Sequence, residues 1–422
     1  MDSKRTNMMQ KTLHVKLAME ASSVLDKIRD DFPDNPGSMD YFYDLYQKTY
    51  AKEKPAEKEG KTIGTMCVQV PDELIYAAGA KPLRLCNGSY SYDQVGADFM
   101  PTKSCALVKA TMGMMHLQKD RMDLDMVIIP TTCDQKKKSG IMLEEMGFNT
   151  YMLEMPSRKD TDNARHYWQN SIKELALELQ KTTGTKITKK RLKSAIDLVN
   201  RARFEYRRLD KLRRQAPSLL YGKDAFLVTN AYFFDEIEPW TAAVKRLNDE
   251  LEERSKNGKY SGNLHSPRLL FTGSPPIFPN MKVPLLVEEL GGIVALDEVC
   301  SSSRMLYDLP SFDEGNLYDM FPGIADRYLK PCTCPCFVNN DDRKRKLLEM
   351  TNSSAIDGVV YQAFSGCQLY EMEHKSISQF LSEKGIPMLY LESDYSPEDK
   401  GQITTRIEAF IESIRIKKKK GV

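Results

Sequence analysis

Two stretches of the sequence place a cysteine directly after a short apolar run and before a segment with helical spacing. The first, DMVIIPTTCDQKKK, covers residues 125–138, and the second, DGVVYQAFSGCQLYEMEH, covers residues 357–374. Each combines an aspartate, a β-branched run typical of a buried strand, a loop of small residues and a cysteine. Alternating strands and helices build parallel sheets, so the two stretches predict two similar α/β units.

The alternation of strands and helices continues around both stretches. The expected strands of the first unit are TMCVQV (65–70), KPLRLC (81–86), LDMVIIP (124–130) and NTYMLEMP (149–156). Those of the second unit lie in PRLLFTGSPP (267–276), GIVALDEVC (292–300), GVVYQAF (358–364) and IPMLYLESD (386–394). Similar order and spacing in the two units indicate an internal repeat of slight sequence identity.

A charged segment with long helical periodicity separates the two units and contains no cysteine. The sequence therefore predicts an α/β fold with two Rossmann-like lobes, each with a parallel sheet, and a helical segment between them. The expected domains are an N-terminal helical region and linker (1–60), a first lobe (61–156), a helical subdomain (157–262) and a second lobe (263–422).

The net charge, the lack of long apolar stretches and the number of cysteines limit the class of protein. The net charge of +2 gives no reason to expect nucleic acid as a partner, and no apolar stretch is long enough for a membrane helix. With no apolar leader at the N-terminus, we expect a cytoplasmic protein. In that reducing compartment nine cysteines indicate chemistry and not a disulfide framework, and an odd number cannot all pair internally.

Six of the nine cysteines can be assigned to two groups of three, one in each predicted lobe. Since ligands gather at the carboxyl ends of parallel strands, each group is expected to converge in space. Three thiolates can hold a cubane iron–sulfur cluster, and neighbouring helix N-termini favour its negative charge. The expected ligands are Cys67, Cys105, Cys133, Cys300, Cys336 and Cys367.

Two alternatives to this interpretation remain at this stage. A buried cysteine is often an ordinary small apolar residue. Structural zinc is a second alternative, although the chain has no C-x2-C pair. The ligand choice is also open in two places: Cys334 or Cys332 could replace Cys336, and Cys86, which the repeat aligns with Cys300, could replace Cys67.

Four stretches resemble the 2-hydroxyacyl-CoA dehydratase and benzoyl-CoA reductase family. They are CVQVPDELIYAAGAKPLRLC, SCALVKATMG, TTCDQKKK and GIPMLYLESDYSPEDKGQITTRIEAFIE, and the resemblance runs from about Gly64 to Ile414. It implies an oxygen-sensitive enzyme that receives single electrons at low potential from a separate ATP-hydrolysing iron–sulfur activator. The chain itself has no P-loop or G-x-G-x-x-G motif, so a partner would hydrolyse ATP.

Subunits of that family typically supply three cysteines for one [4Fe-4S] cluster, and this chain supplies two groups. In this it is most similar to the double-cubane cluster proteins, which resemble homodimeric reductases of small unsaturated molecules. The resemblance implies an [8Fe-9S] double cubane held by the six expected ligands. A dehydratase subunit with a single [4Fe-4S] cluster and an acyl-CoA substrate is the alternative; a non-catalytic protein for metal storage or electron relay is another.

Polar residues near the strand-end cysteines are candidates for supporting roles. His374, Glu371 and Glu373 follow Cys367 and could supply protons to a reduced substrate. Lys136, Lys137 and Lys138 follow Cys133 and could compensate cluster charge or bind an anionic substrate. For both sets, a solvated helix face is the competing interpretation.

Overall fold

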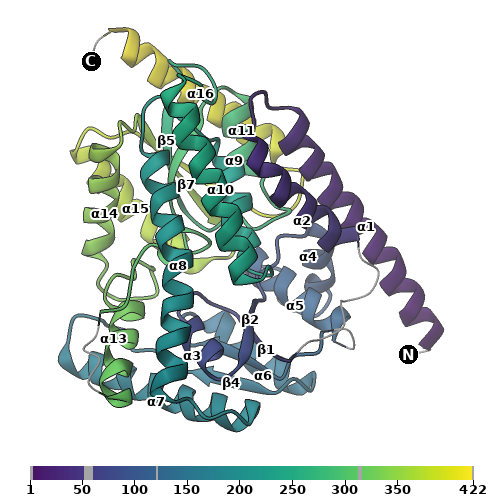
Figure 1. The fold of residues 1–422 in the computed structure, drawn as a ribbon. Helices are drawn as coiled ribbons and strands as arrows, with labels where there is room; N and C mark the ends of the chain where they lie inside the picture. Colours follow the sequence, from purple (N-terminus) through teal and green to yellow (C-terminus); the bar gives the residue numbers. More distant parts are fainter. Residues whose placement is uncertain (1–2, 52–59, 120–121, 312–315, 421–422) are drawn as a thin grey trace.

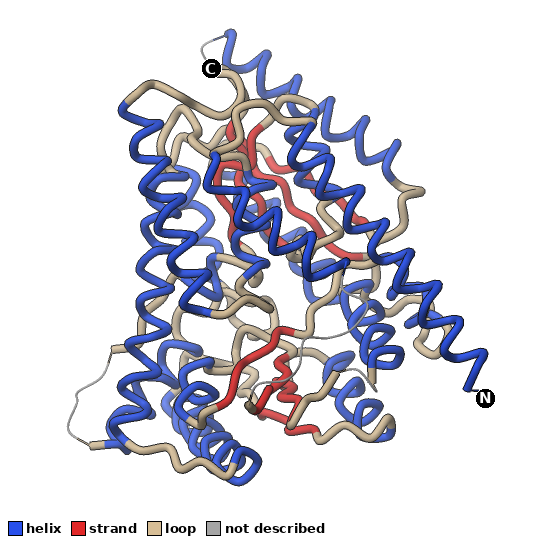
Figure 2. The backbone as a smooth tube through the Cα atoms, turned by 45° about the vertical axis from the view of Figure 1, so that its right-hand side comes forward, coloured by secondary structure: helices blue, strands red, loops and turns tan. Residues whose placement is uncertain are grey.

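The computed structural model describes residues 3–51, 60–119, 122–311 and 316–420 of the chain. Its strands form two separate four-stranded sheets in which neighbouring strands are parallel (Figure 2). The strand order is β2-β1-β3-β4 in the first sheet and β6-β5-β7-β8 in the second, which is one topology used twice. The predicted α/β class with two parallel sheets and a helical segment is confirmed.

The first sheet has helices on both faces, and the pleat of its strands explains why. In β3 all residues are buried: Met126 and Ile128 join one apolar core, while Val127 and Ile129 join another on the opposite face. The elements of this lobe are β1 (Lys61–Thr65), α3 (Asp72–Ala77), β2 (Ala80–Arg84), α4 (Tyr90–Ala97), α5 (Ala106–Gln118), β3 (Met126–Pro130), α6 (Asp134–Glu145) and β4 (Thr150–Leu153).

One long helix of the middle segment is tied to both lobes (Figure 1). In α8, Arg203 forms a buried ion pair with Glu73 of the first lobe at 2.5 Å. Ten residues further, or about 15 Å along the helix, Arg213 forms a buried ion pair with Asp297 of the second lobe at 2.7 Å. The segment comprises α7 (Asp162–Thr183), α8 (Lys189–Arg213), α9 (Gly222–Ala231) and α10 (Ile237–Lys256).

The second lobe repeats the strand order of the first with longer strands. Every residue of β5, β6 and β7 is buried. Its helix α13 instead packs against α7 of the middle segment, whose Trp168 indole donates a hydrogen bond to the Ala325 carbonyl, and it shares an apolar core with the first sheet. The elements are β5 (Arg268–Gly273), α11 (Lys282–Glu289), β6 (Ile293–Glu298), α12 (Ser303–Leu306), α13 (Leu317–Leu329), α14 (Asp341–Ser353), β7 (Gly358–Phe364), α15 (Gln368–Glu383), β8 (Met388–Ser393) and α16 (Lys400–Lys420).

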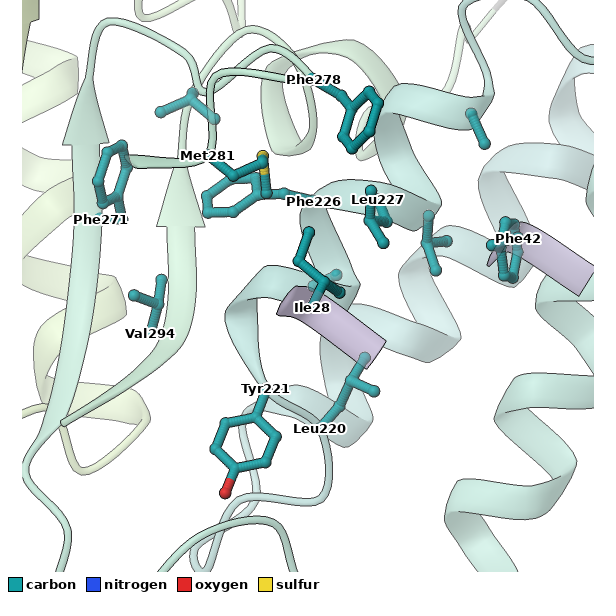
Figure 3. Close-up of a cluster of buried hydrophobic side chains, with 14 of the residues drawn as sticks. Ile28, Phe42, Leu220, Tyr221, Phe226, Leu227, Phe271, Phe278, Met281 and Val294 are labelled. Carbon is teal, nitrogen blue, oxygen red and sulfur yellow. The ribbon is translucent and has the colours of Figure 1, made fainter. Parts of the chain in front are cut away.

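The N-terminal helices α1 (Ser3–Asp30) and α2 (Asp40–Ala51), joined through the short helix η1 (Gly37–Met39), cover the outside of the second lobe. Between them and the sheet lies α9, whose residues are all buried. Figure 3 shows Phe226 and Leu227 of α9 in one apolar cluster with Ile28 of α1 and Phe271 of β5. This core therefore depends on the N-terminal helices.

One local prediction is wrong, and another lies mostly outside the described residues. The strand expected over residues 65–70 is wrong, because β1 ends at Thr65 and the Val70 amide closes a turn onto the Cys67 carbonyl. The predicted charged linker lies mostly in residues 52–59, outside the described residues. The domain boundaries remain a prediction. None of the described helices is long and apolar enough to cross a membrane.

Candidate functional site

In the first lobe, three cysteines follow the carboxyl ends of three neighbouring strands. Cys67 comes after β1, Cys86 after β2 and Cys133 after β3. Because the strand order reverses direction between β1 and β3, Cys67 and Cys133 flank the crevice where α/β sheets bind ligands. The fourth cysteine of this lobe, Cys105, precedes α5 and is buried.

In the second lobe, cysteines follow two strands with the same positions in the sheet. Cys300 comes after β6, the counterpart of β2, and Cys367 comes after β7, the counterpart of β3. The remaining three, Cys332, Cys334 and Cys336, lie in the loop between α13 and α14. This loop precedes α14, the helix before β7, just as Cys105 precedes α5, the helix before β3.

The cysteine-bearing edges of the two lobes face each other. The Cys105 amide donates a hydrogen bond of 2.8 Å to the side-chain oxygen of Gln135, and the Gln135 side-chain nitrogen donates one of 2.9 Å to the Gly366 carbonyl. The chains are so close here that a Cβ on Gly366 would overlap the Lys103 carbonyl oxygen. One glutamine thus links the backbones beside Cys105 and Cys367 across the interface.

Electrostatic interactions link thiols of the two lobes. Hydrogen bonding with Cys367 lowers the pKa of Cys105. Burial raises the pKa of Cys133, which the Cys367 and Cys334 sulfurs of the other lobe raise further. Burial also raises the pKa of Cys300 to about 12, and Cys67 and Cys86 contribute to this shift. The site is therefore one cluster of sulfurs shared between the lobes.

Helix starts point at three of these sulfurs. Cys105, Cys133 and Cys367 occupy the residue before the first turn of α5, α6 and α15. The free amide groups at the start of a helix carry partial positive charge, which favours an anion. Three independent helices thus favour negative charge at the interface.

The three-cysteine loop is held by a buried carboxylate. Glu298, at the end of β6, pairs with Arg304 at 2.5 Å and with Arg343 at 3.5 Å, and it accepts a hydrogen bond from Thr333 at 2.5 Å. Burial alone would raise the pKa of Glu298, but the two guanidinium groups outweigh it and lower the pKa to about 2. Glu298 is therefore ionised at neutral pH and anchors the loop through Thr333.

The sulfurs of this loop differ in environment. Cys332 is buried and accepts a hydrogen bond from the Gln69 side chain of the first lobe. A hydrogen bond with Cys336 lowers the pKa of Cys334 to about 6, with help from Arg304, and raises the pKa of Cys336. The choice of Cys336 as the ligand stays a prediction, as does that of Cys67 over Cys86.

The donor set fits an anionic iron–sulfur group. The soft thiols lie beside helix starts and beside the half-buried Lys136 ammonium group. The Tyr395 hydroxyl is buried near Cys105 and Cys86 and has no hydrogen-bond partner among the described residues. Those residues contain no three side chains placed to hold one metal ion, whereas a cluster of several irons spreads its ligands more widely.

The three predicted proton donors lie on α15 and already have partners. Glu373 pairs with Arg343 at 2.9 Å and accepts a hydrogen bond from Tyr361. His374 stacks on Tyr390 with 3.9 Å between ring centroids. Glu371 accepts a hydrogen bond from the Gly366 amide, one residue before Cys367. Of the three, Glu371 is linked most directly to a cysteine loop, and its role stays a prediction.

Comparison with known proteins decides the family. The family model described as 2-hydroxyglutaryl-CoA dehydratase, D-component, matches residues 67–414 of the chain. The protein belongs to this family. The resemblance found in the sequence is therefore confirmed, and the match includes all nine cysteines.

Relatives extend over nearly the whole chain. A protein of Escherichia coli, provisionally named dehydratase subunit YjiM, is 28% identical over 90% of this chain and 99% of its own length. The β subunit of (R)-2-hydroxyglutaryl-CoA dehydratase from Acidaminococcus fermentans is 24% identical over 84% and 92%. One of the subunits of benzoyl-CoA reductase from Thauera aromatica is 25% identical over 86% and 93%.

Sequence reasoning missed the residues that support the cysteines. Gln135, Glu298, Arg304 and Tyr395 escaped notice. The partners of Gln135 and the Thr333 partner of Glu298 are distant in the sequence. For Glu298, the signal was an acidic residue at the buried end of an apolar strand, which needs a buried cation. Gln135 and Tyr395 carry no such signal.

Proposed function

We propose that the protein is an iron–sulfur reductase that reduces a small unsaturated molecule at a double-cubane [8Fe-9S] cluster. It receives low-potential electrons from an ATP-hydrolysing iron–sulfur activator protein. The observation that carries this proposal is the convergence of sulfurs from both lobes on one interface.

The proposed ligands are three cysteines from each lobe: Cys67, Cys105, Cys133, Cys300, Cys336 and Cys367. Iron–sulfur clusters reach potentials down to about −700 mV, which is the range that demanding reductions require. Joined cubanes need two groups of ligands that face each other, and the Gln135 link holds two of these loops together. The repeated sheet topology supports the same number of ligands per lobe.

The protein's own residues would prepare the site in three ways. The lobes cover Cys105 and limit the access of water. The starts of α5, α6 and α15 stabilise negative charge there. Glu371, hydrogen-bonded to the Gly366 amide, is the candidate to hold a proton on its carboxylate beside Cys367.

The same proposal implies a partner protein and the cellular conditions in which the protein works. Since the sequence has no P-loop motif, ATP hydrolysis would take place in the activator. The low potential would make the protein oxygen-sensitive and suited to anaerobic, cytoplasmic conditions. We also propose a homodimer, because the chain resembles the double-cubane cluster proteins.

The names of the relatives support a second candidate function. Several relatives are named as subunits of dehydratases that act on acyl-CoA thioesters. In that case the protein would be a 2-hydroxyacyl-CoA dehydratase subunit, and so a lyase, with a single [4Fe-4S] cluster. Cys300 and Cys336 would then only pack at the interface.

Turnover measurements separate the two candidates. The anaerobically purified protein would be mixed with a family activator, ATP and a reductant, and offered small unsaturated molecules or 2-hydroxyacyl-CoA thioesters. ATP-dependent reduction of the small molecules, with no dehydration of the thioesters, supports the proposed reductase. Dehydration of a thioester that requires a second subunit supports the alternative and contradicts the first proposal.

A further inference from the structure

A cavity of about 260 Å³ lies beside the three-cysteine loop of the second lobe. Thr333 of this loop forms part of its wall, together with residues of α12 and α14 and the turns next to them. Lys330 and Pro331 also line the cavity and are exposed, so it opens to solvent. Because Ser303 and Met350 are buried, it also reaches the interior of the lobe.

Most of the charged side chains that line this cavity have a partner of opposite charge. The ion pairs are Arg304–Glu298 at 2.5 Å, Arg214–Asp210 at 2.7 Å, Lys330–Asp326 at 2.7 Å and Asp342–Lys159. Two lining charges are left over, one of each sign. In the part of the chain that the structure describes, neither the Lys346 ammonium group nor the Asp308 carboxylate forms an ion pair.

The two leftover charges are half-buried and close to each other. Burial raises the pKa of Asp308, and the nearby charges of Arg327 and Lys346 oppose this rise. Lys346 and Asp308 are therefore near enough to interact, but too far apart for an ion pair. Since a charge removed from water is costly without a partner, both groups favour a bound molecule that supplies one.

A third group without a partner lies in the same cavity. Ser303 is only 9% exposed, and its hydroxyl has no hydrogen bond to any described residue. Buried hydroxyl groups are normally hydrogen-bonded, and this one can both donate and accept. The cavity therefore offers one cation, one anion and one hydroxyl to a ligand.

The remaining wall of the cavity is partly apolar. Tyr307 and Met350 contribute to it, and the Lys346 ammonium group lies 4.9 Å from the centre of the Tyr307 ring. An aromatic ring and a thioether provide surface for a small hydrocarbon group. A ligand with two opposite charges and a short apolar side chain matches this lining.

We propose that the cavity binds a small zwitterion of the amino-acid class, whose carboxylate contacts Lys346 and whose ammonium group contacts Asp308. The Ser303 hydroxyl can form a hydrogen bond with either end. A molecule that carries only one of the two charges would leave the other lining charge unpaired. The site is separate from the proposed cysteine ligands, so the inference does not depend on the proposed function.

The test is isothermal titration calorimetry of the intact protein, purified without oxygen and with its iron content measured. The probes are free L-alanine and L-leucine. Propionate, which is alanine without the amino group, and ethylamine, which is alanine without the carboxylate, are the matched comparisons. We expect saturable binding of one amino acid per chain, and much weaker binding of propionate and ethylamine.

Three variants locate the binding. Lys346→Gln and Asp308→Asn each remove one charged contact and should weaken the binding of the amino acids by about tenfold or more, with Ser303→Ala having a smaller effect. Lys344→Gln is the control, because Lys344 is on α14 but two residues away, and so does not face the same side of the helix. It should bind like the wild type.

Other results would overturn the inference. One is the absence of saturable binding of both amino acids to the wild type up to about 10 mM. Equal affinity of the wild type, Lys346→Gln and Asp308→Asn would place the binding elsewhere. Propionate that binds as tightly as alanine would show that Asp308 has no part in recognition. The wild-type titrations decide the question even if a variant does not fold.

Discussion

The two lobes share one strand order but support their cysteines by different means. In the first lobe the sulfurs lie at strand ends and helix starts, held mainly by backbone groups and by the uncharged Gln135 side chain. In the second lobe the three-cysteine loop depends on the buried charges of Glu298, Arg304 and Arg343. The shared strand order therefore determines where the sulfurs lie, but the interactions that hold them differ between the lobes.

This difference has energetic consequences. Hydrogen bonds between uncharged groups contribute about 0.5–1.5 kcal/mol each to stability. Removing one partner of a buried ion pair costs about 3–5 kcal/mol, because an unpaired charge stays in the interior. The second lobe is therefore the more sensitive half of the site to single substitutions in its supporting residues.

The largest expected effect is the loss of bound iron when a strand-end cysteine is replaced. Cys133→Ser and Cys367→Ser occupy equivalent positions in the two lobes, so each should remove cluster iron, as measured by metal analysis of protein purified without oxygen. Lys138→Gln serves as a surface control. If either serine variant kept its full iron and sulfide, that cysteine would not be a ligand. The two lobes would then not supply ligands from equivalent positions.

A large effect on stability is expected for the buried carboxylates. Glu298→Ala leaves Arg304 and Arg343 without their partner and should lower the free energy of unfolding by about 3–5 kcal/mol in chemical denaturation. Glu73→Ala, which leaves Arg203 unpaired, should have a similar cost.

Iron content then separates the two carboxylate variants. Only Glu298 anchors the cysteine loop through Thr333, so Glu298→Ala should also reduce bound iron, whereas Glu73→Ala should reduce it less. Equal iron loss in both variants would show that general destabilisation, and not the loop anchor, controls the site.

Acid should weaken the second lobe through the same carboxylate. The pKa of Glu298 is lowered from 4.5 to about 2, so its stabilising effect is complete above pH 4.5 and is lost as the pH falls toward 2. Glu298→Gln removes this titration, so its free energy of unfolding should fall less steeply over that interval than that of the wild type. Parallel curves for the two proteins would contradict the assigned pKa.

A smaller effect is expected at the bridge between the lobes. Gln135→Ala removes two hydrogen bonds of 2.8 and 2.9 Å and should cost about 1–3 kcal/mol in unfolding experiments. Gln135→Glu keeps the acceptor for the Cys105 amide but loses the donor to the Gly366 carbonyl and adds a negative charge, so it should be the less stable of the two. A Gln135→Ala variant with unchanged stability would show that the bridge carries little energy.

Much of the fold was predictable because it follows from local patterns. The apolar runs of β3 and β7 and the cysteines after them are visible in the sequence, and the order of the elements predicted the parallel sheets. The strand β1 was misplaced because KTIGT has few apolar residues. Helix α13 was missed since Pro322 lies inside it, and proline is typical of helix ends.

The candidate site was predictable only in part. The six expected ligands could be chosen from strand ends and spacing, and the structure brings them to one interface. The position of the loop with Cys332, Cys334 and Cys336 depends on α13 packing against α7, which no local pattern reveals.

The most direct test of the central claim is the iron and acid-labile sulfide content per polypeptide of protein purified without oxygen. A double cubane shared by the two lobes predicts about eight iron and about nine sulfide per chain. A result of about four of each would contradict it, assign the protein to the branch with a single [4Fe-4S] cluster, and leave Cys300 and Cys336 as packing residues.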